Sequence, residues 1–399
     1  MLVLFTAQYP YGKEEAFVES EIIYLARSFE KIIIIPLFRD SNNSRKVPDN
    51  VRIIEHLVNK EPENKKKILF RNFFKIIKIY LSEIRITNIK SYILYGKFYL
   101  DILVIAYYRS EIIKTIIKEY NLSGMLFYSY WFENSMLALS ILKNDGYIRK
   151  LVARAHRFDL YDESWKQGAL PFRNYKLKWT DKLYIISKYG LNYMKTKTRK
   201  YQHKLVLNYL GVKKPYKLRK PDNQVPLIVS CSSIIERKRV DLIPEVLHNI
   251  EIPLKWIHFG DGELKKQVMA KASGLPEHID FEIKGSVPND EILSFYSCHK
   301  VDMFISLSIS EGLPVSMMEA ISYGIPVFAM NICGVPEIVN KTTGILIGKK
   351  TGVKTIASVL RDTLKNKKFN KEAIINYFVD NFEAENNYMR FVKNIKSLK

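Results

Sequence analysis

The feature that most constrains the fold is a regular alternation of short apolar runs with segments of helical periodicity. Such runs are typical of buried strands, and helical segments between them allow successive strands to run parallel. The pattern therefore predicts a parallel α/β fold. The expected strands of the first half are Leu2–Thr6, Lys31–Pro36, Met125–Tyr128, Leu151–Arg154, Leu183–Ile186 and Leu205–Asn208. Those of the second half are Leu227–Cys231, Leu254–Phe259, Asp280–Ile283, Val301–Leu307, Ile325–Met330 and Gly344–Ile347.

One charged segment interrupts this alternation near the middle of the chain. Residues 211–226 read GVKKPYKLRKPDNQVP, without periodicity and with three prolines. Such a composition is typical of a linker. The chain therefore divides into two α/β units of similar size, and ligands of open α/β sheets bind at the carboxyl ends of the strands.

The composition bounds the class of protein. The 399 residues, 47% of them hydrophobic, suffice for two or three domains. The N-terminus enters a strand-like run directly, so we expect no signal peptide, and no apolar stretch approaches the length of a membrane span. The cysteines Cys231, Cys298 and Cys333 lack metal-ligand spacing and are expected to be reduced thiols of a cytoplasmic protein.

The positive charge is concentrated in the first half. Residues 1–220 hold 41 Lys and Arg against 20 Asp and Glu, whereas residues 221–399 hold 22 against 21. This excess favours a polyanionic partner of the first half: a membrane surface, a phosphorylated lipid or a nucleic acid. An AT-rich genome would also raise the lysine content, but it would raise it equally in both halves of the chain. No nucleic-acid module is recognisable, so we expect an anionic membrane surface and no nucleic acid.

The region from Val58 to Tyr120 is rich in lysine and aromatic residues, and its apolar residues recur at helical spacing. Two interpretations remain open. The region forms helices that pack on the sheet and expose a solvated basic face, or it forms a basic amphipathic surface that lies on anionic lipid.

The segment 304–339 combines a strand, a turn and a helix with two carboxylates eight positions apart. Glu311 falls in the turn after the strand, and Glu319 falls in the first turns of the helix. The N–H groups of a helix N-terminus suit phosphate or sugar oxygens, and carboxylates accept hydrogen bonds from hydroxyls. The segment therefore suits a nucleotide sugar, which is part polyol and part phosphate.

This segment, EGLPVSMME with the flanking residues Gly324, Pro326, Gly334 and Glu337, closely resembles the donor-binding motif of retaining glycosyltransferases of the GT-B fold, family 4 in particular. The resemblance is strong over 227–347, moderate at Gln8–Ile22 and Tyr130–Glu163, and absent in the basic region between Val58 and Tyr120. It implies two Rossmann-like domains facing across a cleft. Residues 1–215 would bind the acceptor, 221–380 would bind the nucleotide sugar, and a C-terminal helix at about 381–399 would cross back to the first domain.

The resemblance assigns the donor site residue by residue. Glu319 would bind the ribose hydroxyls, Glu311 would face the transferred sugar, and Lys238 would bind the diphosphate. Ser233 stands where the family has an arginine, so either Arg237 or Arg239 supplies that charge, or Lys238 and backbone act alone. The other donor-binding candidates are Gly12, Gly260, Gly285, Gly312, Leu313, Pro314 and Val315.

In the first domain, His156 follows an expected strand and matches the family histidine near the transferred sugar. It completes the expected catalytic set with Glu311 and Lys238. Weaker acceptor-binding candidates are Lys13, Arg154, Asp159 and Tyr161. The acidic residues Glu14, Glu15 and Glu19 open an amphipathic helix and are expected to be solvated.

The resemblance implies a retaining, metal-independent glycosyltransferase without a cofactor, using a UDP- or GDP-sugar. The acceptor would be a glycan or a polyprenyl-diphosphate-linked oligosaccharide of bacterial surface polysaccharide assembly. The protein would be cytoplasmic and peripheral on the inner face of the membrane. The alternatives are a GT-B enzyme with a soluble sugar acceptor and a nucleotide-sugar-binding protein with little turnover.

Overall fold

The computed structural model describes residues 1–12, 15–39, 44–85, 88–215 and 224–398. The chain forms two compact units. Unit 1 comprises Met1–Gly211 and Glu385–Lys399, and unit 2 comprises Val212–Ala384. Residues 216–223, half of the expected linker, lie outside the described residues.

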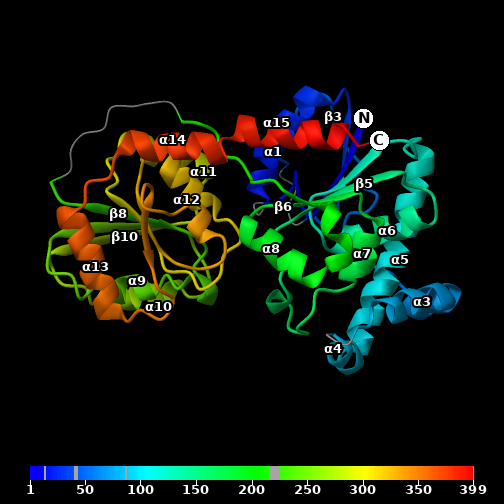
Figure 1. The fold of residues 1–399 in the computed structure, drawn as a ribbon, viewed down its shortest axis with the longest axis horizontal. Coiled ribbons are helices and arrows are strands. Elements are labelled where there is room, and N and C mark those ends of the chain that lie inside the picture. Colours follow the sequence, from blue (N-terminus) through cyan, green and yellow to red (C-terminus); the bar gives the residue numbers. More distant parts are fainter. Residues whose placement is uncertain (13–14, 40–43, 86–87, 216–223, 399) are drawn as a thin grey trace. The chain divides into compact units, whose positions relative to one another are not determined.

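Unit 1 is built on a seven-stranded parallel sheet of order β3-β2-β1-β4-β5-β6-β7 (Figure 1). The strands are β1 (Leu2–Thr6), β2 (Ile32–Pro36), β3 (Val51–Ile53), β4 (Leu126–Ser129), β5 (Lys150–Ala155), β6 (Lys182–Ile185) and β7 (Leu205–Leu207). The helices are α1 (Ala16–Ser28), α2 (Lys65–Arg71), α3 (Phe73–Glu83), α4 (Ile89–Leu94), α5 (Gly96–Glu119), α6 (Asn134–Asn144), α7 (Arg173–Trp179), α8 (Lys188–Lys197) and α15 (Ala384–Lys396).

The five central strands of unit 1, β2, β1, β4, β5 and β6, are buried on both faces, as expected for a covered parallel sheet. Alternation along β1 places Leu2 and Leu4 in a core with α1 and α15, whereas Val3 and Phe5 enter a second core with α5 and α6. The last helix of the chain thus covers the sheet of unit 1, as the expected fold requires.

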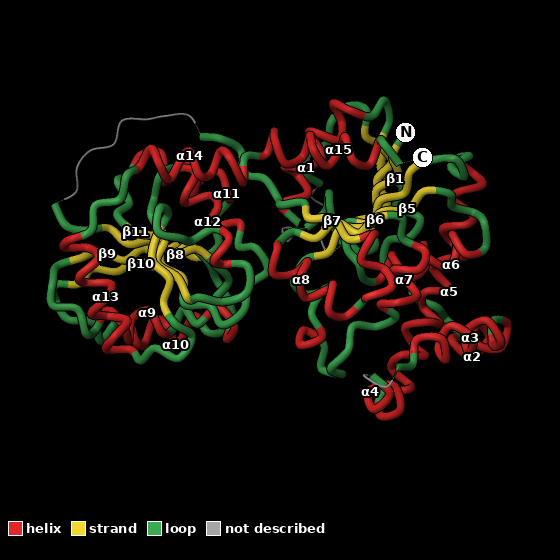
Figure 2. The backbone as a smooth tube through the Cα atoms, viewed as in Figure 1, coloured by secondary structure: helices red, strands yellow, loops and turns green. Residues whose placement is uncertain are grey.

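The helices α2 to α4 do not cover the sheet. They pack on α5 and α7 through a separate core, which includes Ile76, Ile79, Tyr92 and Tyr99. The rings of Tyr92 and Tyr99 are parallel at a centroid distance of 4.0 Å. Figure 2 shows these helices on the far side of α5 from the strands of unit 1.

Unit 2 contains a six-stranded parallel sheet of order β10-β9-β8-β11-β12-β13. The strands are β8 (Leu227–Cys231), β9 (Leu254–Phe259), β10 (Ile279–Gly285), β11 (Met303–Ser306), β12 (Val327–Met330) and β13 (Gly344–Ile347). The helices are α9 (Leu242–Leu247), α10 (Lys265–Ala272), α11 (Asn289–Cys298), α12 (Val315–Ser322), α13 (Val353–Asn366) and α14 (Lys371–Phe382). In Figure 1, α11, α12 and α14 cover one face of this sheet, and α9, α10 and α13 cover the other.

In both sheets the connections change direction at one pair of neighbouring strands, β1 and β4 in unit 1 and β8 and β11 in unit 2. Loops on either side of such a point diverge and leave room for a ligand at the carboxyl ends of the strands. Each unit therefore has one favoured place for a binding site.

Candidate functional site

The site of unit 2 is centred on an ion pair between the two loops of its switch point. Lys238 ends the short 3₁₀ turn that follows β8, and Glu311 lies in the loop between β11 and α12. The Lys238 Nζ lies 2.6 Å from the Glu311 Oε1, and both side chains are largely buried. Burial strengthens such a pair, because little water screens it. The structure thus brings together two of the three expected catalytic residues.

A second cation reaches the same carboxylate. One terminal guanidinium nitrogen of Arg237, Nη1, lies 3.6 Å from the Glu311 Oε2 and donates to the Ser310 carbonyl at 2.9 Å. Ser233 is exposed, and Arg239 lies at the end of the turn with a φ of +48°. Of the two arginines considered for the missing charge, Arg237 is therefore the one that lies against Glu311.

Glu319 lies in α12, two turns after Glu311, and is 7% exposed. Its Oε1 accepts a hydrogen bond of 2.9 Å from the Asn289 side-chain amide. Burial raises the pKa of Glu319 to about 7, and the Asn289 bond offsets part of this rise. Burial removes hydrogen bonds from water to this carboxyl group. Hydroxyl groups of a ligand can replace them by donating to its oxygens.

Three further residues lie near Glu319, and no pattern in the sequence pointed to them. Asn289 is its hydrogen-bond partner. Tyr296 is fully buried, and its hydroxyl has no hydrogen-bond partner among the described residues. Cys231 ends β8, where burial and the nearby Glu319 raise the pKa of its thiol to about 12. These residues lie far apart in sequence, so only the sheet order brings them to one carboxylate.

The candidate residues between the two glutamates form the turn into α12. Gly312, Leu313 and Pro314 are buried, and the partly buried Val315 begins the helix. The helix therefore starts beside the Lys238–Glu311 pair, where its N–H groups favour anionic oxygens.

Gly260, which follows β9, and Gly285, which ends β10, have a different role in the described geometry. Gly260 has a φ of +146°, and a Cβ there would lie 1.8 Å from the Ser232 carbonyl oxygen. Its N–H donates to the Gly285 carbonyl, and Ile234 donates to the Asp261 carbonyl. Because Gly260 has no side chain, its loop can pack against the loop that carries Lys238 and support it. Gly285 has a φ of +74°.

In unit 1, His156 leaves the carboxyl end of β5 and is 7% exposed. Its ring lies 4.4 Å from Trp131 and 5.0 Å from Tyr130, measured between centroids, and neither ring nitrogen has a hydrogen-bond partner in the described structure. Burial, and secondarily Arg154, lower the pKa of His156 well below its usual value. The imidazole is therefore neutral and can accept or donate a hydrogen bond.

Glu15 corrects the expectation of a solvated side chain. It is 2% exposed and accepts hydrogen bonds from the backbone N–H groups of residues 7, 8 and 9, at 2.5–3.1 Å. It also accepts one from the Trp131 indole at 2.5 Å. Glu15 thus fixes the loop after β1 against the loop after β4, beside His156. Gly12 follows this loop with a φ of +71°, and Lys13 lies outside the described residues.

Two weak acceptor candidates are buried among hydrogen-bond partners. Arg154 is fully buried, forms a 3.0 Å ion pair with Glu21 and donates to the Asn208 side chain at 2.9 Å. Asp159 is also fully buried and accepts from the N–H groups of Phe132 and His156. Neither side chain is exposed to solvent, and their acceptor-binding roles stay predictions.

The third candidate, Tyr161, is 2% exposed and belongs to the core beneath the sheet. Its ring packs edge-on against Tyr193 at a centroid distance of 4.9 Å. The structure therefore places it in the protein interior rather than on an acceptor surface.

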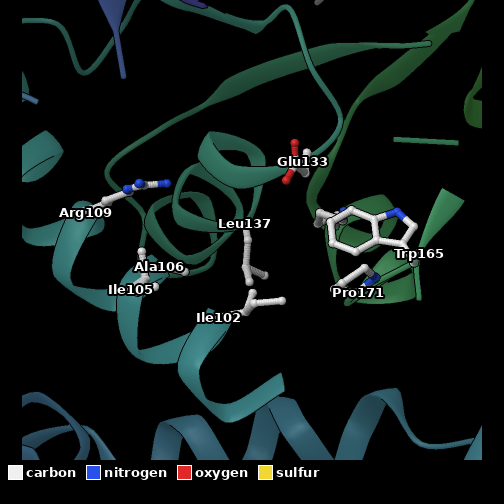
Figure 3. Close-up of a pocket in the computed structure, with 9 residues that line it drawn as sticks. Ile102, Ile105, Ala106, Arg109, Glu133, Leu137, Trp165 and Pro171 are labelled. Carbon is white, nitrogen blue, oxygen red and sulfur yellow. The ribbon is translucent and has the colours of Figure 1, made fainter. Parts of the chain in front are cut away.

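Unit 1 also contains a pocket that the sequence did not indicate (Figure 3). Its volume is about 420 Å³ including solvent at its mouth, and its lining comes from α5, α6 with the preceding Glu133, and the segment 165–176. Arg109, Glu133 and Lys176 supply charge among mainly apolar side chains, and burial lowers the pKa of Lys176 to about 8. Apolar walls with cations suit a ligand that has an apolar body and an anionic group.

The described residues show neither a metal site nor a membrane span. No group of three or more His, Cys, Asp or Glu side chains there is arranged to hold a metal ion. In the same residues, no helix is both long enough and apolar enough to cross a membrane. Cys231, Cys298 and Cys333 are free thiols.

Comparisons with known proteins agree with this geometry. Residues 214–378 match the family model of glycosyl transferases group 1. The putative teichuronic acid biosynthesis glycosyltransferase TuaC of Bacillus subtilis (strain 168) is 25% identical over 135 residues, 34% of this chain and only 32% of TuaC. The chain therefore matches about a third of that relative's length.

Solved structures extend the likeness to the whole chain. The apo lipopolysaccharide outer core galactosyltransferase WaaB has a TM-score of 0.70 at 13% identity and 99% coverage of both chains. Anabaena HepE in complex with UDP-glucose has a TM-score of 0.64 at 13% identity, with both chains fully covered. At such identities the likeness shows the fold alone. The chain therefore has the GT-B fold and carries, at residues 214–378, a domain of the glycosyl transferases group 1 family.

Proposed function

We propose that this protein is a retaining glycosyltransferase of the family 4 type, which moves a sugar from a UDP- or GDP-sugar to a glycan or lipid-linked oligosaccharide. The observation that carries the proposal is the buried Lys238–Glu311 pair beside Glu319, at the switch point of a glycosyl transferases group 1 domain. This site offers a cation for phosphate and carboxylates for sugar hydroxyls.

In the proposed reaction, Glu319 accepts hydrogen bonds from the two ribose hydroxyls. Lys238, assisted by Arg237, stabilises the negative charge that develops on the departing diphosphate. The acceptor hydroxyl attacks the sugar from the face that the diphosphate leaves. As it attacks, the departing diphosphate takes the proton of this hydroxyl. Glu311 orients the sugar, and its carboxylate stabilises the positive charge that develops there. The role of His156 toward the sugar stays a prediction from the sequence.

The proposal needs no metal, because cations and backbone N–H groups bind the diphosphate. It places the protein in bacterial surface polysaccharide biosynthesis, on the inner face of the cytoplasmic membrane. Its support is the similarity to TuaC, which is named as a glycosyltransferase of teichuronic acid biosynthesis, and the excess of positive charge in residues 1–220.

The first test is a thermal-shift screen against UDP-, GDP-, ADP- and CMP-sugars, with magnesium and with a chelator. A donor should raise the unfolding midpoint, and the rise should survive chelation. It should vanish in Glu319→Ala but persist in the matched control Glu263→Ala, whose side chain is exposed in the same unit. No shift with any nucleotide sugar would contradict the proposal.

A measurement of turnover distinguishes the enzyme from a protein that only binds nucleotide sugars. The second alternative is favoured by Ser233, which stands where the family has an arginine. Release of nucleoside diphosphate that depends on an added glycan or lipid-linked acceptor supports the enzyme. NMR of the product should show the anomeric configuration of the donor. Donor binding without release under any acceptor would favour the binding protein, and turnover with a free sugar alone would favour the soluble-acceptor enzyme.

A further inference from the structure

The helices α2 to α4 expose an unusual number of large apolar side chains. Phe70 and Phe74 are 88% and 86% exposed, and Ile93 is 74% exposed. The other exposed members between residues 70 and 95 are Phe73, Leu81, Ile89, Leu94 and Tyr95. Scattered apolar residues are common on surfaces, but eight within 26 residues mark an interaction surface.

This surface is not a loosely packed core. The inward side chains of the same helices are buried: Ile76 and Tyr92 are 0% exposed, and the Tyr80 hydroxyl donates to the Tyr92 carbonyl at 2.6 Å. Glu83 is 1% exposed and fastens the end of α3 to the start of α7, accepting from the N–H groups of Asn174 and Tyr175. The helices thus have a packed inner face, and the exposed apolar side chains of residues 70–95 define their outer face.

The charge around the outer face has one sign. Residues 65–97 hold nine Lys and Arg, all exposed, and a single acidic residue, the buried Glu83. Three of the cations pair with acids outside this range: Lys65 with Asp101, Arg71 with Glu111 and Lys75 with Asp145. Within the described structure, the other six have no ion-pair partner.

We propose that the outer face of α2 to α4 docks on an anionic lipid bilayer. Phe70, Phe74 and their apolar neighbours enter the boundary between headgroups and acyl chains, and the lysines contact lipid phosphates. A second copy of this chain would bring like charges together. A nucleic acid would gain nothing from Ile93 and Leu94, which cannot stack on bases.

The inference rests on the proposed function, since it explains how the enzyme would reach a lipid-linked acceptor. It goes beyond that function by locating the contact, and by requiring apolar insertion in addition to charge attraction. Salt at about 0.5 M would then weaken the binding without abolishing it, because screening removes only the electrostatic part.

The test is sedimentation of the full chain with vesicles of phosphatidylcholine, with and without phosphatidylglycerol. The wild type should bind the anionic vesicles, and Phe70→Ser with Phe74→Ser should bind them at least tenfold more weakly. Met269→Ser is the matched control, because Met269 is an exposed apolar side chain, 38% exposed, of α10 in unit 2. Both substitutions lie on the surface and should leave the unfolding midpoint unchanged.

Equal binding of wild type and double variant would overturn the inference, as would binding that high salt abolishes. The inference would also be overturned if the wild type self-associated with rising concentration, or bound single-stranded nucleic acid, and the double variant did not. The donor-dependent thermal shift, measured on the same samples, separates the two proposals. Loss of vesicle binding with an unchanged shift supports the docking surface and leaves the donor site intact.

Discussion

At the scale of single residues, burial governs the protonation of Glu319. Its pKa in the folded protein is about 7, above its ordinary value of 4.5. Between these values the unfolded chain releases its proton while the folded protein retains it. The contribution of Glu319 to stability therefore falls as the pH rises from about 4.5 to 7, by up to roughly 3 kcal/mol.

Stability and donor binding should consequently respond to pH in opposite directions. We expect the ligand-free protein to gain stability from Glu319 between pH 8 and 5, whereas the donor-induced shift weakens, because a protonated carboxyl accepts fewer hydroxyl bonds. Unfolding midpoints with and without the donor measure both. Glu319→Gln should lose both trends, and a donor shift that grows at low pH would contradict the proposed role.

The cation of Lys238 should matter more than that of other lysines in unit 2. Lys238→Met removes the charge nearest the proposed leaving group, so we expect turnover to fall by about 100-fold or more. Lys265→Met is the control, since Lys265 pairs at 2.7 Å with Asp261, which is exposed. Steady-state release of nucleoside diphosphate gives the comparison, and similar losses in both variants would exclude a specific role for Lys238.

Prediction from sequence at the scale of residues chose Lys238 and Glu311 because each follows a strand in a known motif. The structure shows that the two side chains form an ion pair, and their functional roles stay predictions. The burial of Arg154 and Glu15 was not predicted. Their partners, such as Asn208 for Arg154 and Trp131 for Glu15, lie 54 and 116 positions away. The local sequence does not show such distant partners, so a charged residue is predicted to be solvated even where the fold buries and pairs it.

At the scale of elements, the loop after β9 supports the loop after β8 through direct backbone contact. Gly260→Ala would place a methyl group 1.8 Å from the Ser232 carbonyl oxygen, at a φ of +146°. We expect a loss of roughly 3 kcal/mol in stability and weaker donor binding, because the loop that carries Lys238 must move.

Equilibrium unfolding and donor titration of the variant test this prediction. Gly274→Ala is the matched control, because a Cβ there would meet its nearest neighbour at an ordinary 3.6 Å. If Gly260→Ala is as stable as the control and binds donor equally, the glycine has no supporting role.

The sequence predicted most elements because parallel strands are continuous apolar runs. All twelve expected strands have counterparts in the sheets. β3 was missed because Val51–Ile53 is short, contains an arginine and lies at the sheet edge. The basic region after Val58 was left between two interpretations, because periodicity predicts helices but not which core they join. The structure shows α2 to α4 packing on α5 and α7 instead of the sheet.

At the scale of the whole molecule, the chain leaves unit 1 once, forms unit 2 and returns through α15. The division falls at Gly211 and Glu385, close to the ends expected from the linker and the last helix. The donor candidates other than Gly12 lie in unit 2, whereas the folding of unit 1 depends on the final residues of the chain.

That dependence makes a prediction about Phe391 in α15. Its ring is fully buried, 4.8 Å from the Tyr184 ring and 4.5 Å from the Arg154 guanidinium carbon. Phe391→Ala should therefore destabilise unit 1 by about 4 kcal/mol. Met389→Ala, on the same helix but 39% exposed, should cost less than about 0.5 kcal/mol.

Denaturant unfolding, followed with and without donor, separates the two units. Phe391→Ala should lower the transition that donor does not shift, because the binding residues of unit 2 make no use of α15. The donor-sensitive transition and the donor affinity should match those of Met389→Ala. If Phe391→Ala lowered both transitions together, the two units would unfold as one cooperative body, and α15 would stabilise the whole chain instead of the sheet it covers.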